Sequence, residues 1–268
     1  MPSPWPETPW RAAVVDRTEW PLPEMSRQLT SRESAEVQSY HAQRQPRSAL
    51  ARVVARQLLA PHAAAGWCAA RPVDVGRAMP EEDVATEILS GARRHRQRPR
   101  ICRAGIPVEH CGVSFAHSGA FTLVMVGQER VGADLEAIAP KRPEFYRQMF
   151  SSAEQRWVVD AARDTDVAPE AWFTLLWCAK EAYLKASDEA VSVWSFGQWT
   201  MTPRLSAASI ESGWIAACGV STTLRVQGPG RTETVHLHVR RQADLLAVGL
   251  QMPDGEHAPA EYRGTGQP

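Results

Sequence analysis

Residues 177–185 read Trp-Cys-Ala-Lys-Glu-Ala-Tyr-Leu-Lys (WCAKEAYLK), with two lysines on either side of one glutamate. Lysine is scarce in this protein, because only Lys141, Lys180 and Lys185 among its 30 basic residues are lysines. The stretch lies in a segment that predicts a helix over about residues 169–186, with a proline near its first turn. The first question that the sequence raises is why lysine, and not arginine, stands at these two positions of the helix.

On a helix, one face of the segment carries residues at spacings of three and four: Trp177, Lys180, Glu181 and Leu184. Lys185 follows Glu181 by four residues. The pair can be an exposed ion pair beside a buried Trp and Leu, worth about 0.2–0.5 kcal/mol. Arginine would serve such a pair equally well. A lysine offers a compact charge on a thin stem, which suits a phosphate oxygen in a crowded site.

A second stretch, 131–136, reads VGADLE and predicts a strand. Asp134 and Glu136 are two residues apart and point to the same face of that strand. They form either the solvated face of an edge strand or a pair of hard oxygen ligands, which Mg²⁺ accepts together with waters and phosphates. The alternate positions are apolar and predict a buried opposite face, and Gly132 allows a close approach to the backbone.

Two further stretches carry polar chemistry. Residues 114–119, SFAHSG, place His117 beside serine and glycine just before the apolar strand 121–126, as an ordinary turn or as a phosphate-binding group. The arginines include Arg47 and the run RRHRQRPRICR at 93–103. The run is a solvated face or contacts a polyanionic small ligand, because the neutral net charge and the lack of interleaved aromatics disfavour nucleic acid.

The chain of 268 residues is 44% apolar and 22% charged, as in ordinary globular proteins. Its pattern predicts an α+β fold with helices on antiparallel sheets. We expect an irregular N-terminal arm over 1–30, an N-terminal lobe over 31–127, a C-terminal lobe over 128–252 and a disordered tail over 253–268. The strands at 121–126 and 131–136 are predicted to form a hairpin across a turn-like GQER.

Several protein classes are disfavoured by the sequence. No apolar run reaches the length of a membrane helix, and the N-terminus lacks a hydrophobic signal core, so we expect a cytoplasmic protein without membrane partners. The 5 cysteines are spread widely with no CxxC pair, which disfavours a disulfide framework or a zinc site. The chain has no GxSxG, GxxxxGK[ST] or GxGxxG motif of serine hydrolases, P-loop proteins or dinucleotide-binding proteins.

Taken in order, SFAHSG, GADLE, FSSAE at 150–154 and WCAKEAYLK resemble the 4'-phosphopantetheinyl transferase family, in its larger two-lobed group. The resemblance covers about residues 40–250 and implies two similar α/β lobes in a pseudo-two-fold arrangement, with coenzyme A between them. It also implies the reaction, in which a serine of an acyl or peptidyl carrier protein takes phosphopantetheine from coenzyme A and 3',5'-ADP is released. We expect a monomer.

The resemblance also assigns residue roles. Three carboxylates would hold Mg²⁺ against the pyrophosphate: Asp134, Glu136 and Glu181. Glu181, or a water that it orients, would take the serine proton, and Lys185 would neutralise phosphate charge, with Asp134 completing the catalytic set. Further coenzyme A contacts would come from Arg47, Arg98, His117 and Lys180, unless Lys180 pairs locally.

The chain departs from the family pattern at Ala116, where serine is frequent, and at Arg98, where lysine is usual. Glu154 is predicted to close a capping box with Ser151. Two other functions stay open: a non-catalytic binder of coenzyme A or carrier proteins, and a Mg²⁺-dependent phosphohydrolase.

Overall fold

The computed structural model of the chain describes residues 10–60, 66–68, 86–90, 99–103, 105–127, 130–187, 193–205 and 219–252. Arg98, most of the arginine run at 93–103 and the predicted tail at 253–268 lie outside these residues. No helix within the described ranges is long and apolar enough to cross a membrane.

The described residues of the first half of the chain form a 6-stranded sheet with three α-helices. Its elements are β1 (Trp10–Asp16), η1 (Arg17–Glu19), α1 (Leu22–Arg27), α2 (Ser31–Gln38), α3 (Gln45–Leu59), β2 (Gly66–Trp67), β3 (Thr86–Ser90), β4 (Pro99–Arg103), β5 (Ile106–Ser118) and β6 (Phe121–Gly127). The strand order is β2-β1-β6-β5-β4-β3, and the β1–β2 contact is its parallel pair.

Where the structure describes the second half, it forms a 5-stranded antiparallel sheet with three more α-helices. Its elements are β7 (Val131–Ala137), α5 (Pro143–Met149), α6 (Ser152–Arg163), α7 (Pro169–Ala186), η2 (Val193–Gln198), β8 (Thr200–Pro203), β9 (Val220–Gly228), β10 (Arg231–Gln242) and β11 (Leu245–Gln251). The strand order is β7-β11-β10-β9-β8. The helix predicted over 169–186 is confirmed by α7.

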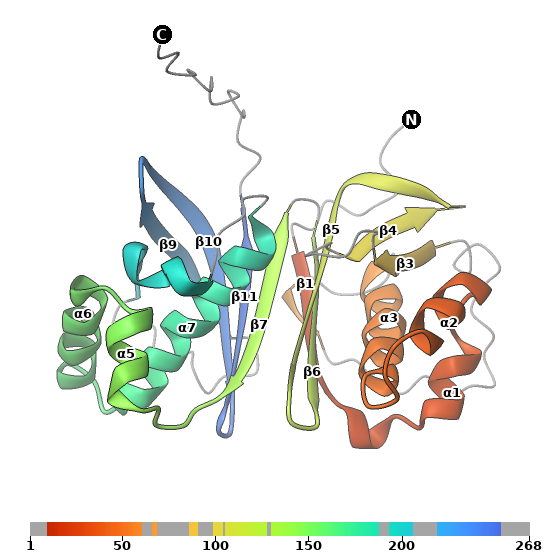
Figure 1. Cartoon of the computed structure of the whole chain (residues 1–268), viewed down its shortest axis with the longest axis horizontal. Helices are drawn as coiled ribbons and strands as arrows, with labels where there is room; N and C mark the ends of the chain where they lie inside the picture. The colour runs from red at the N-terminus through yellow and green to blue at the C-terminus, as the bar shows by residue number, and fades with distance from the viewer. Residues whose placement is uncertain are drawn as a thin grey trace, which may run out of the picture.

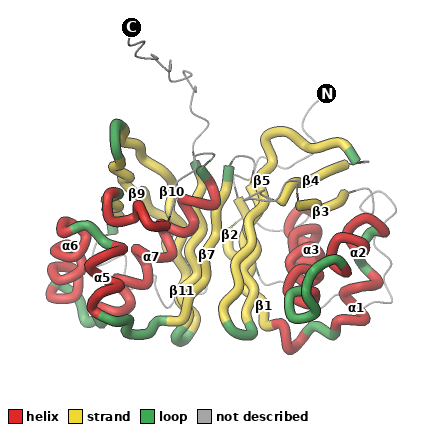
Figure 2. The backbone as a smooth tube through the Cα atoms, in the orientation of Figure 1, coloured by secondary structure: helices red, strands yellow, loops and turns green. Residues whose placement is uncertain are grey.

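The two sheets lie in the middle of the molecule, with α1, α2 and α3 outside one and α5, α6 and α7 outside the other (Figure 1). The tube view shows the same sequence of layers from helices to sheet to sheet to helices (Figure 2). Each sheet packs its helices over its own apolar core. A third core lies between β1, β5 and β6 of one sheet and β7 and β11 of the other. This mixed architecture agrees with the predicted α+β class.

The irregular arm predicted for residues 1–30 is wrong from Trp10 onward. Residues 10–16 form β1, whose residues pair one to one with β6 from Trp10–Gly127 to Asp16–Phe121. The segment was misjudged because its prolines and tryptophans suggested a linker. The prolines flank the strand, however, and the strand is apolar enough to bury Ala12, Ala13 and Val15.

The hairpin predicted between 121–126 and 131–136 is also wrong. Strand β6 pairs with β1 and β5, whereas β7 pairs with β11 in the other sheet. The chain passes from one sheet to the other between Gly127 and Val131, although β6 and β7 still pack against each other. Strand length and a turn-like linker indicate a hairpin locally, but the partner of β7 is more than 100 residues away in sequence.

Candidate active site

Strand β7 presents its polar residues to a helix. Val131, Ala133 and Leu135 point into the core between the two sheets, as the alternation predicted. The opposite face therefore carries Asp134 and Glu136, and this face is covered by α7. Although β7 is the edge strand of its sheet, its two carboxylates are not a solvated face.

Gly132 sets how closely α7 approaches this strand. A Cβ atom at Gly132 would lie 1.8 Å from the carbonyl oxygen of Ala182 and 2.9 Å from the amide nitrogen of Ala186. No side chain fits there, because real carbon–oxygen contacts are longer than 3 Å. The close approach predicted for Gly132 is confirmed, and it holds the last turns of α7 directly against the carboxylates of β7.

Lys185 and Asp134 connect the helix to the strand. The Nζ atom of Lys185 donates to Asp134 Oδ1 at 2.7 Å and to the carbonyl oxygen of Ala133 at 2.8 Å. The Lys185 side chain keeps 30% of its surface exposed, against 11% for Asp134. The other carboxylate oxygen, Asp134 Oδ2, is buried and has no hydrogen bond from any described residue. The buried Cys178 thiol lies beside this carboxylate, and burial, followed by the charge of Asp134, raises the pKa of that thiol well above its usual range.

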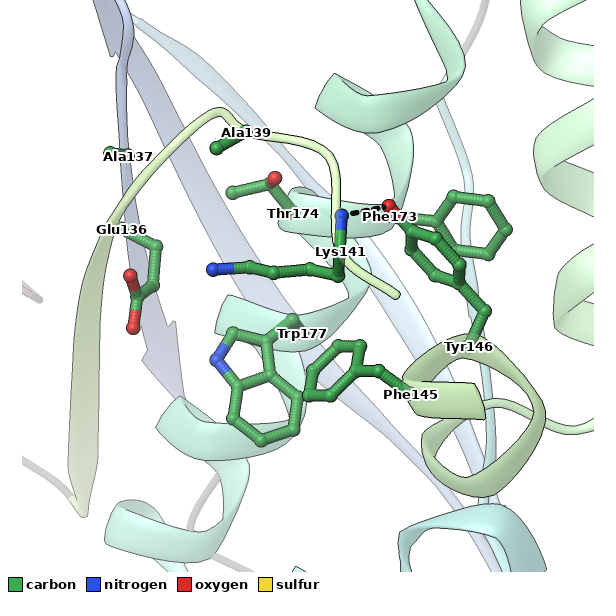
Figure 3. Close-up of a pocket in the computed structure, with 9 residues that line it drawn as sticks. All are labelled: Glu136, Ala137, Ala139, Lys141, Phe145, Tyr146, Phe173, Thr174 and Trp177. Atoms are coloured by element: carbon green, nitrogen blue, oxygen red, sulfur yellow. Dashed lines mark hydrogen bonds between the residues drawn. The ribbon is translucent and has the colours of Figure 1, made fainter. Parts of the chain in front are cut away.

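Glu136 lies at one wall of a small pocket at the surface (Figure 3). The pocket is formed by the loop after β7, by α5 and by α7, and its lining is largely aromatic: Phe145, Tyr146, Phe173 and Trp177. Burial, and then the nearby charge of Asp134, raises the pKa of Glu136.

Glu181 lies on α7 and is half-buried. It is three residues after Cys178 and four before Lys185, so it belongs to the helix face that meets Asp134. The three predicted magnesium ligands thus come from two elements in contact. Their side chains are not already gathered, however, because no three His, Cys, Asp or Glu side chains in the described ranges lie close enough to hold a metal ion.

His117 lies at the end of β5, and it brings charges from three other elements together. The residue is exposed to solvent at one side. Desolvation of its ring by the atoms packed around it, followed by the positive charges of Arg47, Lys185 and Arg17, lowers the pKa of its imidazole to about 4. Its Nδ1 atom is 3.0 Å from Thr122 Oγ1. The turn after it is tight, because Gly119 has a φ of 56°. The imidazole is therefore a neutral group in a positively charged site at neutral pH.

Arg47 lies in the first turn of α3 and is half-buried. Its Nε atom is buried and has no hydrogen-bond partner among the described residues. Since a buried donor without a partner costs about 1–3 kcal/mol, this atom is poised for an acceptor from outside the chain. The positive charge of Arg47 is among those that lower the pKa of His117, so the two side chains lie near each other.

Lys180 does not belong to this site. Its side chain has no exposed surface, and its Nζ atom lies within 3.0 Å of Glu154 Oε2 and of the carbonyl oxygens of Met149, Phe196 and Trp199. The prediction that Lys180 contacts coenzyme A is wrong in this structure, because its ammonium is enclosed by these four acceptors. The alternative of local pairing is the one observed. Glu154 closes the predicted capping box with Ser151 as well.

Residues 130–210 match the family model described as the 4'-phosphopantetheinyl transferase superfamily. This part of the chain is a domain of that superfamily. The matched residues include β7 and α7, which carry both carboxylates of the strand and the Glu181–Lys185 face of the helix. A comparison with curated proteins finds no match for the chain.

Sequence reasoning missed two features of this transferase domain's surroundings. Arg17 was assigned to an irregular arm, and its arrival beside His117 depends on the long-range pairing of β1 with β6. The aromatic pocket beside Glu136 was missed because its lining comes from three elements. The FYRQMF run at 145–150, which begins in α5, was the available signal, since Phe145, Tyr146 and Phe150 form one aromatic cluster.

Proposed function

We propose that this protein transfers 4'-phosphopantetheine from coenzyme A to a serine of an acyl or peptidyl carrier protein, with Mg²⁺, and releases 3',5'-ADP. The superfamily domain at 130–210 supports phosphopantetheine transfer in general. The observation that carries the fuller proposal is the meeting of Asp134 and Lys185 near His117 and the positively charged Arg47 of the other half of the chain.

The placement of coenzyme A follows from this meeting. Lys185 belongs to α7 in the second half, whereas Arg47 and His117 belong to the first half. A ligand that contacts all three lies across the two halves. The halves themselves support a pseudo-two-fold arrangement, because the orders β1-β6-β5-β4-β3 and β7-β11-β10-β9-β8 correspond strand by strand.

The donors of β7 and α7 fit a magnesium ion in their chemistry. Asp134, Glu136 and Glu181 offer hard carboxylate oxygens, and Asp134 Oδ2 is a buried acceptor without a hydrogen bond. When bound, Mg²⁺ supplies Lewis-acid stabilisation of charge on the pyrophosphate oxygens. Burial, and then the charge of Asp134, raises the pKa of Glu136, and a cation bound between the two carboxylates would lower it.

The protein's own groups perform the remaining tasks. In this phosphoryl transfer the serine oxygen bonds to the β-phosphorus of coenzyme A, the bond to the bridging oxygen breaks, and the serine proton goes to Glu181 or to a water it orients. Lys185, with 30% of its side chain exposed, can turn its ammonium from Asp134 Oδ1 toward a phosphate oxygen. His117 and Arg47 would hold the 3'-phosphate, because the charge of Arg47 lies close to the His117 ring.

A single assay tests the proposal. The protein is incubated with coenzyme A, Mg²⁺ and an apo carrier protein, and the mass of the carrier is measured. A gain of one phosphopantetheine group is the expected result. Loss of coenzyme A without a gain in carrier mass would identify a phosphohydrolase, and binding without either change would identify a non-catalytic binder. We further propose a monomeric cytoplasmic protein without nucleic-acid or membrane partners.

A further inference from the structure

Arg17 is fixed beside the His117 site by backbone pairing. The residue begins η1 directly after β1, and its backbone N–H donates to the carbonyl oxygen of Ala120 at 2.9 Å. Ala120 belongs to the turn between β5 and β6. On the adjoining strands, His117 pairs with Thr122, and Thr122 pairs with Val15. Arg17 therefore starts its side chain at the same end of the sheet as the imidazole.

The charge of Arg17 is only partly balanced. Among the described residues Arg17 makes no ion pair, and its side chain is half-buried. Its neighbour Asp16 directs Oδ1 to the backbone N–H and hydroxyl of Thr18, at 2.8 and 2.7 Å, where it caps η1. The effect of Arg17 on Asp16 is the smallest of the influences on the pKa of that carboxyl. The carboxylate is thus engaged by Thr18 rather than by the guanidinium.

The groups around His117 match a phosphate with two negative charges. Arg17 and Arg47 each provide a planar set of donors, and a dianion can accept from both. When the Thr122 hydroxyl donates to His117 Nδ1, the neutral ring carries its proton on Nε2 and can donate it to a third oxygen. A bridging phosphate of the pyrophosphate has less charge and fewer free oxygens than a terminal monoester.

We propose that Arg17 is a ligand of the terminal phosphomonoester of coenzyme A, held together with Arg47 and His117. This inference rests on the proposed function. It extends that function by assigning a specificity role to η1, an element outside the domain matched at 130–210. Arg17 would help the protein distinguish coenzyme A from the same molecule without its 3'-phosphate.

The test compares two ligands that differ only in this phosphate. Titration calorimetry measures the affinities of wild-type protein, Arg17→Gln and Arg17→Met for coenzyme A and for 3'-dephospho-coenzyme A. The control is Arg163→Gln on α6, whose side chain is 68% exposed. Both Arg17 variants are expected to bind coenzyme A about tenfold more weakly, the loss of one hydrogen-bonded charge contact, with unchanged affinity for the dephospho ligand. Arg163→Gln is expected to bind both ligands as the wild type does.

The outcomes separate this inference from the function on which it rests. If both ligands weaken equally in the Arg17 variants, Arg17 supports the fold of the site and is not a phosphate ligand. Unchanged affinity for coenzyme A, in a wild-type protein that still modifies the carrier, would also overturn the role of Arg17 and leave the proposed function intact. If the wild type neither binds coenzyme A nor modifies the carrier, both proposals fail. The methionine variant keeps an apolar stem and serves where glutamine disturbs folding.

Discussion

Replacing Lys180 by methionine should strongly destabilise the protein. The Lys180 side chain is fully buried, and its ammonium compensates the equally buried Glu154 carboxylate at 2.8 Å. In Lys180→Met that carboxylate keeps its bonds from the Ser151 and Met201 backbone N–H groups but loses its counter-ion. Breaking a buried pair on one side costs about 3–5 kcal/mol. For a chain of this size we expect the midpoint of thermal unfolding to fall by about 6–20 °C.

The assay is urea and thermal unfolding of the purified variant by circular dichroism at pH 7, beside Arg163→Met as the matched control. The Arg163 pair with Asp160 is exposed, with side chains 68% and 59% exposed, so this control should change the unfolding free energy by less than about 1 kcal/mol. A Lys180→Met protein that melts within 2 °C of the wild type would refute the argument.

The pH dependence supplies the sign of the effect. Burial raises the pKa of Glu154, and Lys180 is the main group that lowers it. Without Lys180 the folded-state pKa rises further above the unfolded value, so the folded state favours a protonated carboxyl. The destabilisation should therefore be largest at neutral pH and diminish as the pH falls toward the pKa of the buried carboxyl. A deficit that grows on acidification would show that a different interaction was lost.

Four further changes test the site. Lys185→Arg should keep the thermal midpoint within a few degrees but lower kcat/KM for coenzyme A at least about tenfold, since a guanidinium is bulkier beside Asp134. A variant with the kcat/KM of the wild type would show that Lys185 is only a surface residue. Asp134→Ala should stay folded by circular dichroism and lose nearly all transfer, so near-normal turnover in saturating Mg²⁺ would exclude a metal role. Gly132→Ala should lower the unfolding free energy by about 2 kcal/mol or more, because a Cβ would overlap the Ala182 carbonyl, and a wild-type urea midpoint would contradict this close contact. The pKa of His117 is lowered to about 4, and the negative charge of a bound phosphate should raise it and favour protonation of the ring below pH 6.5. Calorimetry in buffers of different ionisation heat should therefore detect proton uptake when coenzyme A binds to the wild type, and this uptake should be absent in His117→Gln.

Local pattern was sufficient for the elements that carry the carboxylates. The alternation in VGADLE identified the buried and polar faces of β7, and the proline and spacing of 169–186 identified α7 with its boundaries. Gly132 was identified as a close contact because a glycine inside a strand has few other uses. These predictions depend on neighbours within about four residues, and the structure confirms them.

The pairing of distant segments was not available from local pattern. Lys180 and Lys185 lie five residues apart in one helix, and nothing in their spacing reveals that one is enclosed while the other is exposed. The difference comes from α5, α6 and η2, whose Met149, Glu154 and Phe196 surround only the first lysine. Likewise, β1 looked like a linker because its partner, β6, lies about 100 residues further along the chain.

The apolar core between the two sheets limits how this protein can be divided into fragments. A fragment ending at Gly127 would display Ala12, Leu123 and Met125 to water, and the remaining fragment would display Leu135 and Ala247. Neither piece is a free-standing module that can be grafted onto another protein as a cassette. The Ser114 hydroxyl, which accepts a hydrogen bond from the Ala133 backbone N–H at 3.0 Å, would also lose this hydrogen-bond partner. The two fragments carry matching apolar faces, so we expect them to associate as an obligate pair when they are co-expressed as two polypeptides.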